Sequence, residues 1–199
     1  MPTGVALHDA RERLLAAAER VLVREGPSAL TSRAVTAEAG LAKGVLHRHF
    51  ADFDAFLAEL VRRRIARLEP VSEALRGAAG SATVTANLTR ALGDLMDPVA
   101  VAVVGLVVSR DGLRALLRTT TPAGIPLLNE AAQMVGAYLA EEQRRGRVAA
   151  GADTAALAPA LIGAAHLLFA DRHAGPPPPE VLAQAVAATL GGALPAGDA

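Results

Sequence analysis

The sequence predicts an all-α protein, with a small three-helix domain at the N-terminus and a larger helical domain behind it. Apolar residues recur at the spacing of amphipathic helices along most of the chain. Hydrophobic residues make up 52% of the sequence and aromatic residues only 3%, so we expect cores built by close helix–helix approach. The β-branched run Val99–Val108 could also be a buried strand. We favour a helix there, because a lone strand would leave unpaired edges.

Capping residues, glycines and prolines delimit the expected N-terminal elements. These elements are a first helix from the capping box of Asp9 and Glu12 to Gly26-Pro27, a second from the N-cap Thr31 to Gly40, a third from Ala42 to about His49, and a fourth capped by Asp52 that can continue to about Leu75. The expected later helices are Thr83–Met96, one from Pro98 to about Ser109, Leu127 to about Arg145, one from the cap Asp153 to about Phe169, and Val181–Leu190.

Composition excludes several classes of protein. The chain has no cysteine, which rules out a disulfide scaffold and a thiolate zinc site. Its longest apolar run is too short to span a bilayer, and the first residues do not form a signal peptide, so we expect a soluble cytoplasmic protein. No nucleophile–base motif, phosphate-binding loop or metal motif is present. We therefore expect neither an enzyme nor a cofactor or metal ion.

The charge is distributed unevenly, although the net charge is zero. Residues 1–70 carry 11 Lys and Arg against 9 Asp and Glu, a balance of +2, which leaves −2 for the rest of the chain. The N-terminal part is therefore the better partner for an anion. Lys43 is the single lysine of the chain and lies in this part.

Two short helices joined by a glycine turn point to a helix-turn-helix. Gly40 can take the positive φ that such a turn requires, and Val35, Leu46 and Phe50 can pack beneath the first helix. The other face of the third helix then presents Ala42, Lys43, Gly44, His47 and Arg48. That face is about 10–12 Å long, a size that fits a major groove about 12 Å wide.

The stretch LTSRAVTAEAGLAKGVLHRHFADFDAFL resembles the DNA-binding segment of the TetR family of transcriptional regulators. The residues that match the family pattern at the right spacing are Thr31, Ala39, Gly40, Gly44, Leu46, His49 and Phe50. The resemblance implies a DNA-binding domain at residues 1–52 and a ligand-binding and dimerisation domain at residues 53–199. It also implies a ligand-responsive repressor. The residues placed by it at the DNA interface are Thr31, Ser32, Arg33, Ala42, Lys43, Gly44, His47, Arg48 and His49.

Three departures from the family pattern keep an alternative open. Ala42 replaces a serine at the start of the third helix, His47 replaces a tyrosine, and Phe53 replaces a cation. A helical small-molecule binder or adaptor that has lost operator binding would share this fold. His49 is equally well explained as a packed structural histidine. His47 and His49 do not form a metal pair, because residues two apart on a helix point in different directions.

The resemblance further implies a homodimer through the last two helices, double-stranded DNA with a palindromic operator as partner, and an unknown small-molecule effector. Polar and adaptable side chains among the apolar helices are the candidates for an effector pocket. Each of them could also be an ordinary core or surface residue. The candidates are Met96, Asn129, Gln133, Met134, Tyr138, Ile162, His166 and Phe169, with His173 on the same stripe as the last three.

Overall fold

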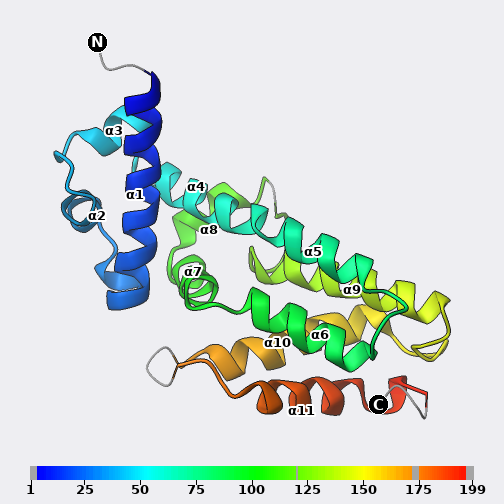
Figure 1. Ribbon diagram of the computed structural model, residues 1–199. Helices are drawn as coiled ribbons and strands as arrows, with labels where there is room; N and C mark the ends of the chain where they lie inside the picture. Colours follow the sequence, from blue (N-terminus) through cyan, green and yellow to red (C-terminus); the bar gives the residue numbers. More distant parts are fainter. Residues whose placement is uncertain (1–3, 120, 172–174, 196–199) are drawn as a thin grey trace. The chain divides into compact units, whose positions relative to one another are not determined.

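The computed structural model describes residues 4–119, 121–171 and 175–195, and within these ranges all regular secondary structure is helical (Figure 1). The all-α prediction is therefore confirmed. The elements are α1 Gly4–Glu25, η1 Pro27–Ala29, α2 Ser32–Glu38, α3 Val45–His49, α4 Phe53–Ala66, α5 Leu68–Gly77, α6 Val84–Leu95, α7 Pro98–Ser109, α8 Asp111–Leu117, α9 Leu128–Arg144, α10 Thr154–Phe169, α11 Pro179–Leu190 and η2 Gly191–Ala193.

One compact unit contains the chain up to Arg64 together with Ala102–Pro126. It holds α1 to α3, most of α4 and of α7, and α8. Its core contains fully buried leucines of α1 together with Leu46 of α3 and Phe56 of α4. The apolar residues of α1 recur every three to four positions, and α2, α3 and η1 all pack against that helix.

The second unit contains Ile65–Val101 and the chain from Leu127 onward. Here α9 packs on α10, and α11 packs on both α10 and α6. Small residues permit these close contacts. A Cβ added at Gly136 of α9 would lie 3.5 Å from the Cβ of Ala158 of α10. The expected use of small side chains for helix packing is confirmed at this crossing.

Asp52 and Asp153 cap helices as predicted, and Thr83, expected as the first residue of its helix, is the N-cap of α6. The side chain of Thr83 accepts a hydrogen bond from the Ala86 amide at 3.1 Å, and Asp153 accepts from Ala155 and Ala156 at 3.0 Å. Asp52 accepts from the Ala55 amide at 2.7 Å. The ambiguous run after Pro98 is the helix α7. The division of function at residue 52 stays a prediction.

Three expectations about the elements were wrong, and one element was not expected. α1 begins at Gly4, so Asp9 lies inside the helix, where its carboxylate is 3.8 Å from Arg13 instead of capping. α3 begins at Val45 and not at Ala42, since residues 42–44 form a turn that is closed by the hydrogen bond from the Val45 amide to the Ala42 carbonyl. The expected fourth helix is two helices that separate at Arg67. α8 had no counterpart among the expected elements.

No single helix in the described ranges is both long enough and apolar enough to span a membrane. The bent pair formed by α6 and α7 would meet that test by length and composition alone.

Candidate nucleic-acid interface and ligand pocket

α2 is positioned by hydrogen bonds at both of its ends. The Thr31 hydroxyl accepts from the Ala34 amide at 3.1 Å, as expected for an N-cap. At the other end Gly40 has a φ of +63°, which suits glycine and confirms the predicted turn. The guanidinium of Arg13 on α1 donates to the Ala39 carbonyl at 2.8 Å. Both ends of α2 are therefore defined, one by its own sequence and one by α1.

α3 is a short helix that begins without a capping side chain. The Val45 amide donates to the Ala42 carbonyl at 2.9 Å, so residues 42–44 form a turn that leads into the helix. Leu46 is fully buried, and Phe50 packs edge-on to Phe56 with ring centroids 5.0 Å apart. The inward packing of this face is confirmed. Lys43 therefore lies on the turn before α3 and not on the helix itself.

Arginines on α1 and α4 pair with acidic side chains of the same unit. Glu38 of α2 illustrates this, because Arg20 and Arg24 donate to it at 2.7 and 2.9 Å. Hydrogen bonds from Arg20 and then Arg24 lower the pKa of Glu38. The paired arginines of α1 and α4 are Arg11, Arg13, Arg20, Arg24, Arg62 and Arg63.

The cationic side chains of the helix-turn-helix differ from the arginines of α1 and α4 in their ion pairing. Within the described ranges, Arg33, Lys43 and Arg48 form no ion pair, and all three are exposed. Arg33 and Lys43 also line a shallow hollow of about 390 Å³ together with Thr36, Ala37 and Leu41. This hollow has two free positive charges on its wall, which is suitable for an anion such as a phosphate group.

The residues predicted to contact DNA fall on one contiguous stretch of the same unit. Seven of them are exposed: Thr31, Arg33, Ala42, Lys43, Gly44, His47 and Arg48. Ser32 and His49 are half-buried. The His49 ring lies 6.5 Å from that of Phe50, centroid to centroid. His49 therefore packs beside Phe50 and is also partly accessible to solvent. Its role as a DNA contact stays a prediction, as does the alternative of a structural histidine.

The predicted effector-pocket residues differ in their burial. Gln133 is exposed on α9, Asn129 is half-buried on the same helix, and Met96 is buried at the end of α6. Met134, Tyr138 and Ile162 are buried, whereas His166 and Phe169 are half-buried on α10. His173 lies outside the described residues. The effector pocket therefore stays a prediction.

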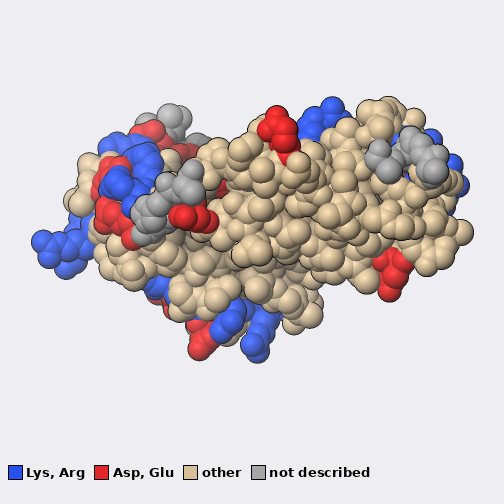
Figure 2. Space-filling model, turned by 90° about the horizontal axis from the view of Figure 1, so that it is seen from below, with Lys and Arg blue, Asp and Glu red and all other residues tan. Residues whose placement is uncertain are grey.

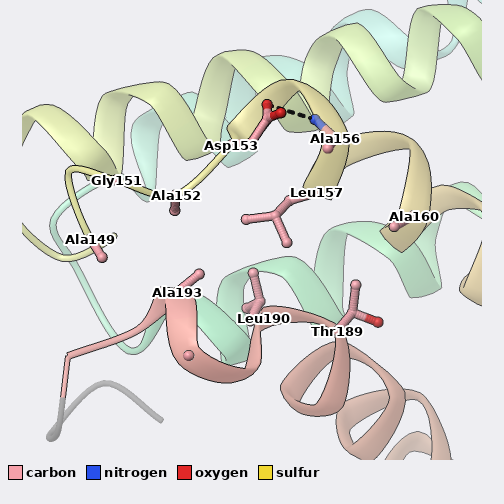
Figure 3. A pocket seen from close by; sticks show the side chains of 11 residues that line it. Ala149, Gly151, Ala152, Asp153, Ala156, Leu157, Ala160, Thr189, Leu190 and Ala193 are labelled. Atoms are coloured by element: carbon pink, nitrogen blue, oxygen red, sulfur yellow. Dashed lines mark hydrogen bonds between the residues drawn. The ribbon is translucent and has the colours of Figure 1, made fainter.

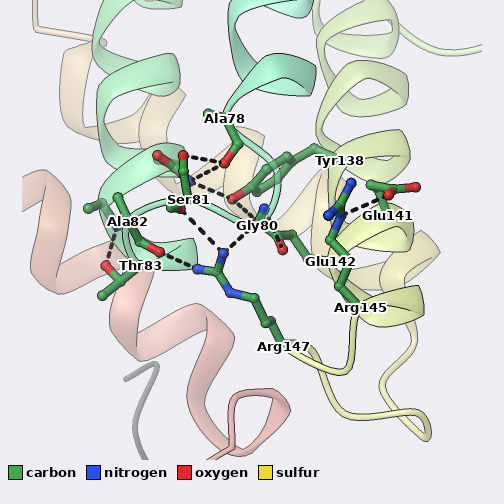
Figure 4. Close-up of polar contacts among 12 residues, drawn as sticks. Ala78, Gly80, Ser81, Ala82, Thr83, Tyr138, Glu141, Glu142, Arg145 and Arg147 are labelled. Atoms are coloured by element: carbon green, nitrogen blue, oxygen red, sulfur yellow. Dashed lines mark hydrogen bonds and ion pairs between the residues drawn. The ribbon is translucent and has the colours of Figure 1, made fainter.

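Tyr138 is fixed by a buried polar network (Figure 4). Its hydroxyl donates to the Glu142 carboxylate at 2.7 Å and accepts from the Asn87 amide group at 3.0 Å. Burial, reinforced by the bond to Glu142, raises the pKa of Tyr138 well above the usual tyrosine value. The fully buried Glu142 also accepts from the Gly80 amide and lies 3.6 Å from Arg147. The network joins the turn between α5 and α6 to the end of α9.

His166 differs from Tyr138 because its buried Nδ1 has no hydrogen-bond partner among the described residues. Burial lowers the pKa of His166 and favours its neutral form. A neutral imidazole with an unused polar atom can accept or donate one hydrogen bond. Among the predicted pocket residues, His166 is the one whose buried side-chain nitrogen lacks a hydrogen-bond partner in the described part of the chain.

An open pocket of about 710 Å³ lies between the start of α10 and the end of α11 (Figure 3). Its lining is mostly small and apolar, and the one carboxylate on its wall, Asp153, is bonded to the amides at the start of α10. None of the predicted pocket residues lines it. The prediction missed this pocket because polar residues were taken as its signal, whereas alanines dominate the wall.

The described residues contain no group of three or more His, Asp or Glu side chains arranged to hold a metal ion.

Comparison with known proteins agrees with these observations at the N-terminus. Residues 14–60 match the family model described as bacterial regulatory proteins, tetR family. No curated protein matches the sequence. The match covers all of α2 and α3, the later part of α1 and the first part of α4.

Solved structures extend the likeness to the whole fold. A γ-butyrolactone receptor, an ArpA-like protein, superposes with a TM-score of 0.71 at 19% identity, over 95% of this chain and 90% of that one. The multidrug binding protein EbrR complexed with imidazole gives 0.60 at 22% identity, over 94% and 95%. A member of the TetR family from Streptomyces coelicolor A3 gives 0.62 at 23% identity, over 94% and 99%.

Proposed function

We propose, from the match of residues 14–60 to the family model of bacterial regulatory proteins, tetR family, and from the fold that the chain shares with TetR-family structures, that the protein is a ligand-responsive transcriptional repressor in the cytoplasm that binds a palindromic operator as a homodimer. The nine residues from Thr31 to His49 predicted from the sequence form its DNA contacts. Its effector is a small molecule, and the protein carries out no chemical reaction.

The observation that supports DNA binding best is the contrast between paired and unpaired cations. Arginines of α1 and α4 are neutralised by carboxylates, whereas exposed Arg33, Lys43 and Arg48 have no ionic partner among the described residues. Unpaired cations on an exposed face are the groups that displace counterions from DNA phosphates. The small Ala42 and Gly44 beside them allow close approach of the backbone to a groove.

The dimer proposal rests on the surface of the last two helices. α10 contains no Lys, Arg, Asp or Glu, and Leu167 on it is 77% exposed. Val181 on α11 is 38% exposed. Figure 2, which views the molecule from the side of α10 and α11, shows a broad area without charged side chains. An uncharged face of this kind is stabilised by burial against a second copy.

The effector proposal rests on two features of the second unit. The open pocket between α10 and α11 has mainly apolar walls, and the buried Nδ1 of His166 has an unmet hydrogen bond within the described residues. Two of the similar structures bear names that refer to small molecules, a γ-butyrolactone receptor and a protein complexed with imidazole. His166 does not line this pocket, so the pocket by itself would suit a mainly apolar compound.

A second candidate function is a helical small-molecule binder without operator binding. It is favoured by α3, which begins only at Val45 and has no capping side chain. A helix of five residues presents less surface to a groove than the eight expected. His47 also replaces the tyrosine of the family pattern.

DNA binding distinguishes the two candidates. We expect the protein to select a two-fold symmetric duplex from a random library, and a gel shift of that duplex to disappear in Lys43→Ala/Arg48→Ala with unchanged circular dichroism. Arg24→Ala, which removes a paired arginine, should leave the gel shift intact. Failure of the wild-type protein to enrich any duplex would favour the binder without operator binding. Compounds that raise the melting temperature and release the duplex would identify the effector.

A further inference from the structure

One arginine outside the N-terminal helices contacts both ends of the helix-turn-helix. Nη2 of Arg110, at the junction of α7 and α8, donates to the Leu30 carbonyl at 2.9 Å. The Cζ atom of the same guanidinium lies 5.6 Å from the centroid of the Phe53 ring. Nη1 lies 4.0 Å from the Asp54 carboxylate. All of these residues belong to the same compact unit.

The contacted residues flank the DNA-binding segment in sequence. Leu30 directly precedes Thr31, the N-cap of α2, and is fully buried. Phe53 directly follows Asp52, the residue that caps α4 after α3 has ended. A single side chain therefore holds the point where the helix-turn-helix begins and the point where it ends.

The contact with Phe53 continues through a series of rings to the end of α3. Phe53 stacks on Phe56 with centroids 5.7 Å apart and an interplanar angle of 23°. Phe56 in turn meets Phe50, the residue that ends α3, at 5.0 Å. A displacement of the Phe53 ring would thus be felt at the base of α3, because packed rings transmit strain.

We propose that Arg110 is a positioning residue for DNA binding: it holds Leu30 and Phe53 and thereby fixes residues 31–52 in the geometry that meets DNA. The inference rests on the proposed function. An arginine suits this task because its planar fork can donate to a carbonyl while its face covers a ring, which an ammonium group does less well. Arg110 itself touches no DNA.

Hydrogen exchange tests the positioning step without any DNA. In Arg110→Ala, we expect the amides of residues 34–41 to exchange about tenfold faster, because the carbonyl of a buried residue loses its donor. The matched control is Arg114→Ala on α8, which loses only a local ion pair with Asp111 and should exchange like the wild type. If Arg110→Ala does not fold, Arg110→Lys should give about threefold faster exchange. Wild-type exchange in the folded variant would overturn the proposal.

DNA binding provides the second readout, measured with the duplex selected by the wild-type protein. Arg110→Ala should bind it about tenfold more weakly, while the slope of log K against log salt stays unchanged, because no phosphate contact is lost. A shallower slope would make Arg110 a direct contact and contradict the proposal, as would unchanged affinity. If the wild type selects no duplex, the proposed function fails, and the exchange measurement alone decides whether Arg110 anchors the segment.

Discussion

The hydroxyl of Tyr138 donates a hydrogen bond of 2.7 Å to the carboxylate of Glu142, one turn further along α9, and both side chains are buried. Glu142 is the acceptor for the Gly80 amide as well and the ionic neighbour of Arg147. Its removal would leave several polar groups without their partner inside the second unit.

We expect Glu142→Ala to lower the free energy of unfolding by about 3 kcal/mol, since breaking a buried pair leaves an uncompensated charge. The adjacent Glu141 makes only ion pairs with Arg144 and Arg145 near the surface. Glu141→Ala is therefore the matched control and should change stability by less than about 1 kcal/mol. Urea denaturation of both variants measures the difference. Equal losses would mean that the buried network contributes no more than a surface pair.

The glycines of the helix-turn-helix give a second matched pair. Gly40 has a φ of +63°, so Gly40→Ala should destabilise the protein by about 1–2 kcal/mol. Gly44 has a φ of −79° and open space where a Cβ would lie, so Gly44→Ala should leave stability unchanged or raise it by about 0.5 kcal/mol. Thermal unfolding of the two variants checks this order, and the reverse order would refute the assigned turn.

The titration of His166 predicts a dependence of stability on pH. Burial lowers its pKa in the folded state, so below pH of about 6.5 the unfolded chain takes up a proton that the folded protein does not. Stability contributed by the neutral His166 is therefore present above that pH and lost as the pH falls. His166→Leu should lose less stability than the wild type between pH 7 and pH 5. Parallel curves for the two proteins would show that the pKa of His166 is the same in the folded and unfolded states, and would contradict this prediction.

The dimer surface is tested at its most exposed apolar side chain. Leu167→Glu places a charge on the uncharged face of α10 and should shift the protein from dimer to monomer in sedimentation velocity. Leu116 on α8 is 44% exposed, and Leu116→Glu is the control that should remain dimeric. A dimer that survives Leu167→Glu but dissociates in Leu116→Glu would place the interface elsewhere.

Elements defined by neighbouring residues could be predicted from the sequence. Thr31 caps α2 through an atom three residues away, and Gly40 adopts the turn conformation by itself. These features depend on backbone sterics and short-range hydrogen bonds, which any stretch of the chain reveals. The inward face of α3 was predictable for the same reason, because Leu46 and Phe50 are one turn apart.

Features that depend on distant partners could not be predicted. The start of α3 lacks a capping side chain, so nothing in its sequence distinguishes Ala42 from Val45 as the first residue. Glu142 is buried because Gly80 and Asn87 of other elements complete its network. Arg110 finds its acceptor 80 positions earlier in the chain. In the sequence, Glu142 and Arg110 look like ordinary charged side chains, because their partners lie far away along the chain.

In the account given above, the unpaired cations Arg33, Lys43 and Arg48 are the groups of the protein that neutralise DNA phosphates. The most direct test is fluorescence anisotropy of the selected duplex at several salt concentrations, with the wild type and with Lys43→Ala/Arg48→Ala. We predict that the slope of log K against log salt becomes shallower by about one for each cation that contacts a phosphate, so by as much as about two in the double variant. A slope identical to that of the wild type, with the fold intact, would contradict the claim.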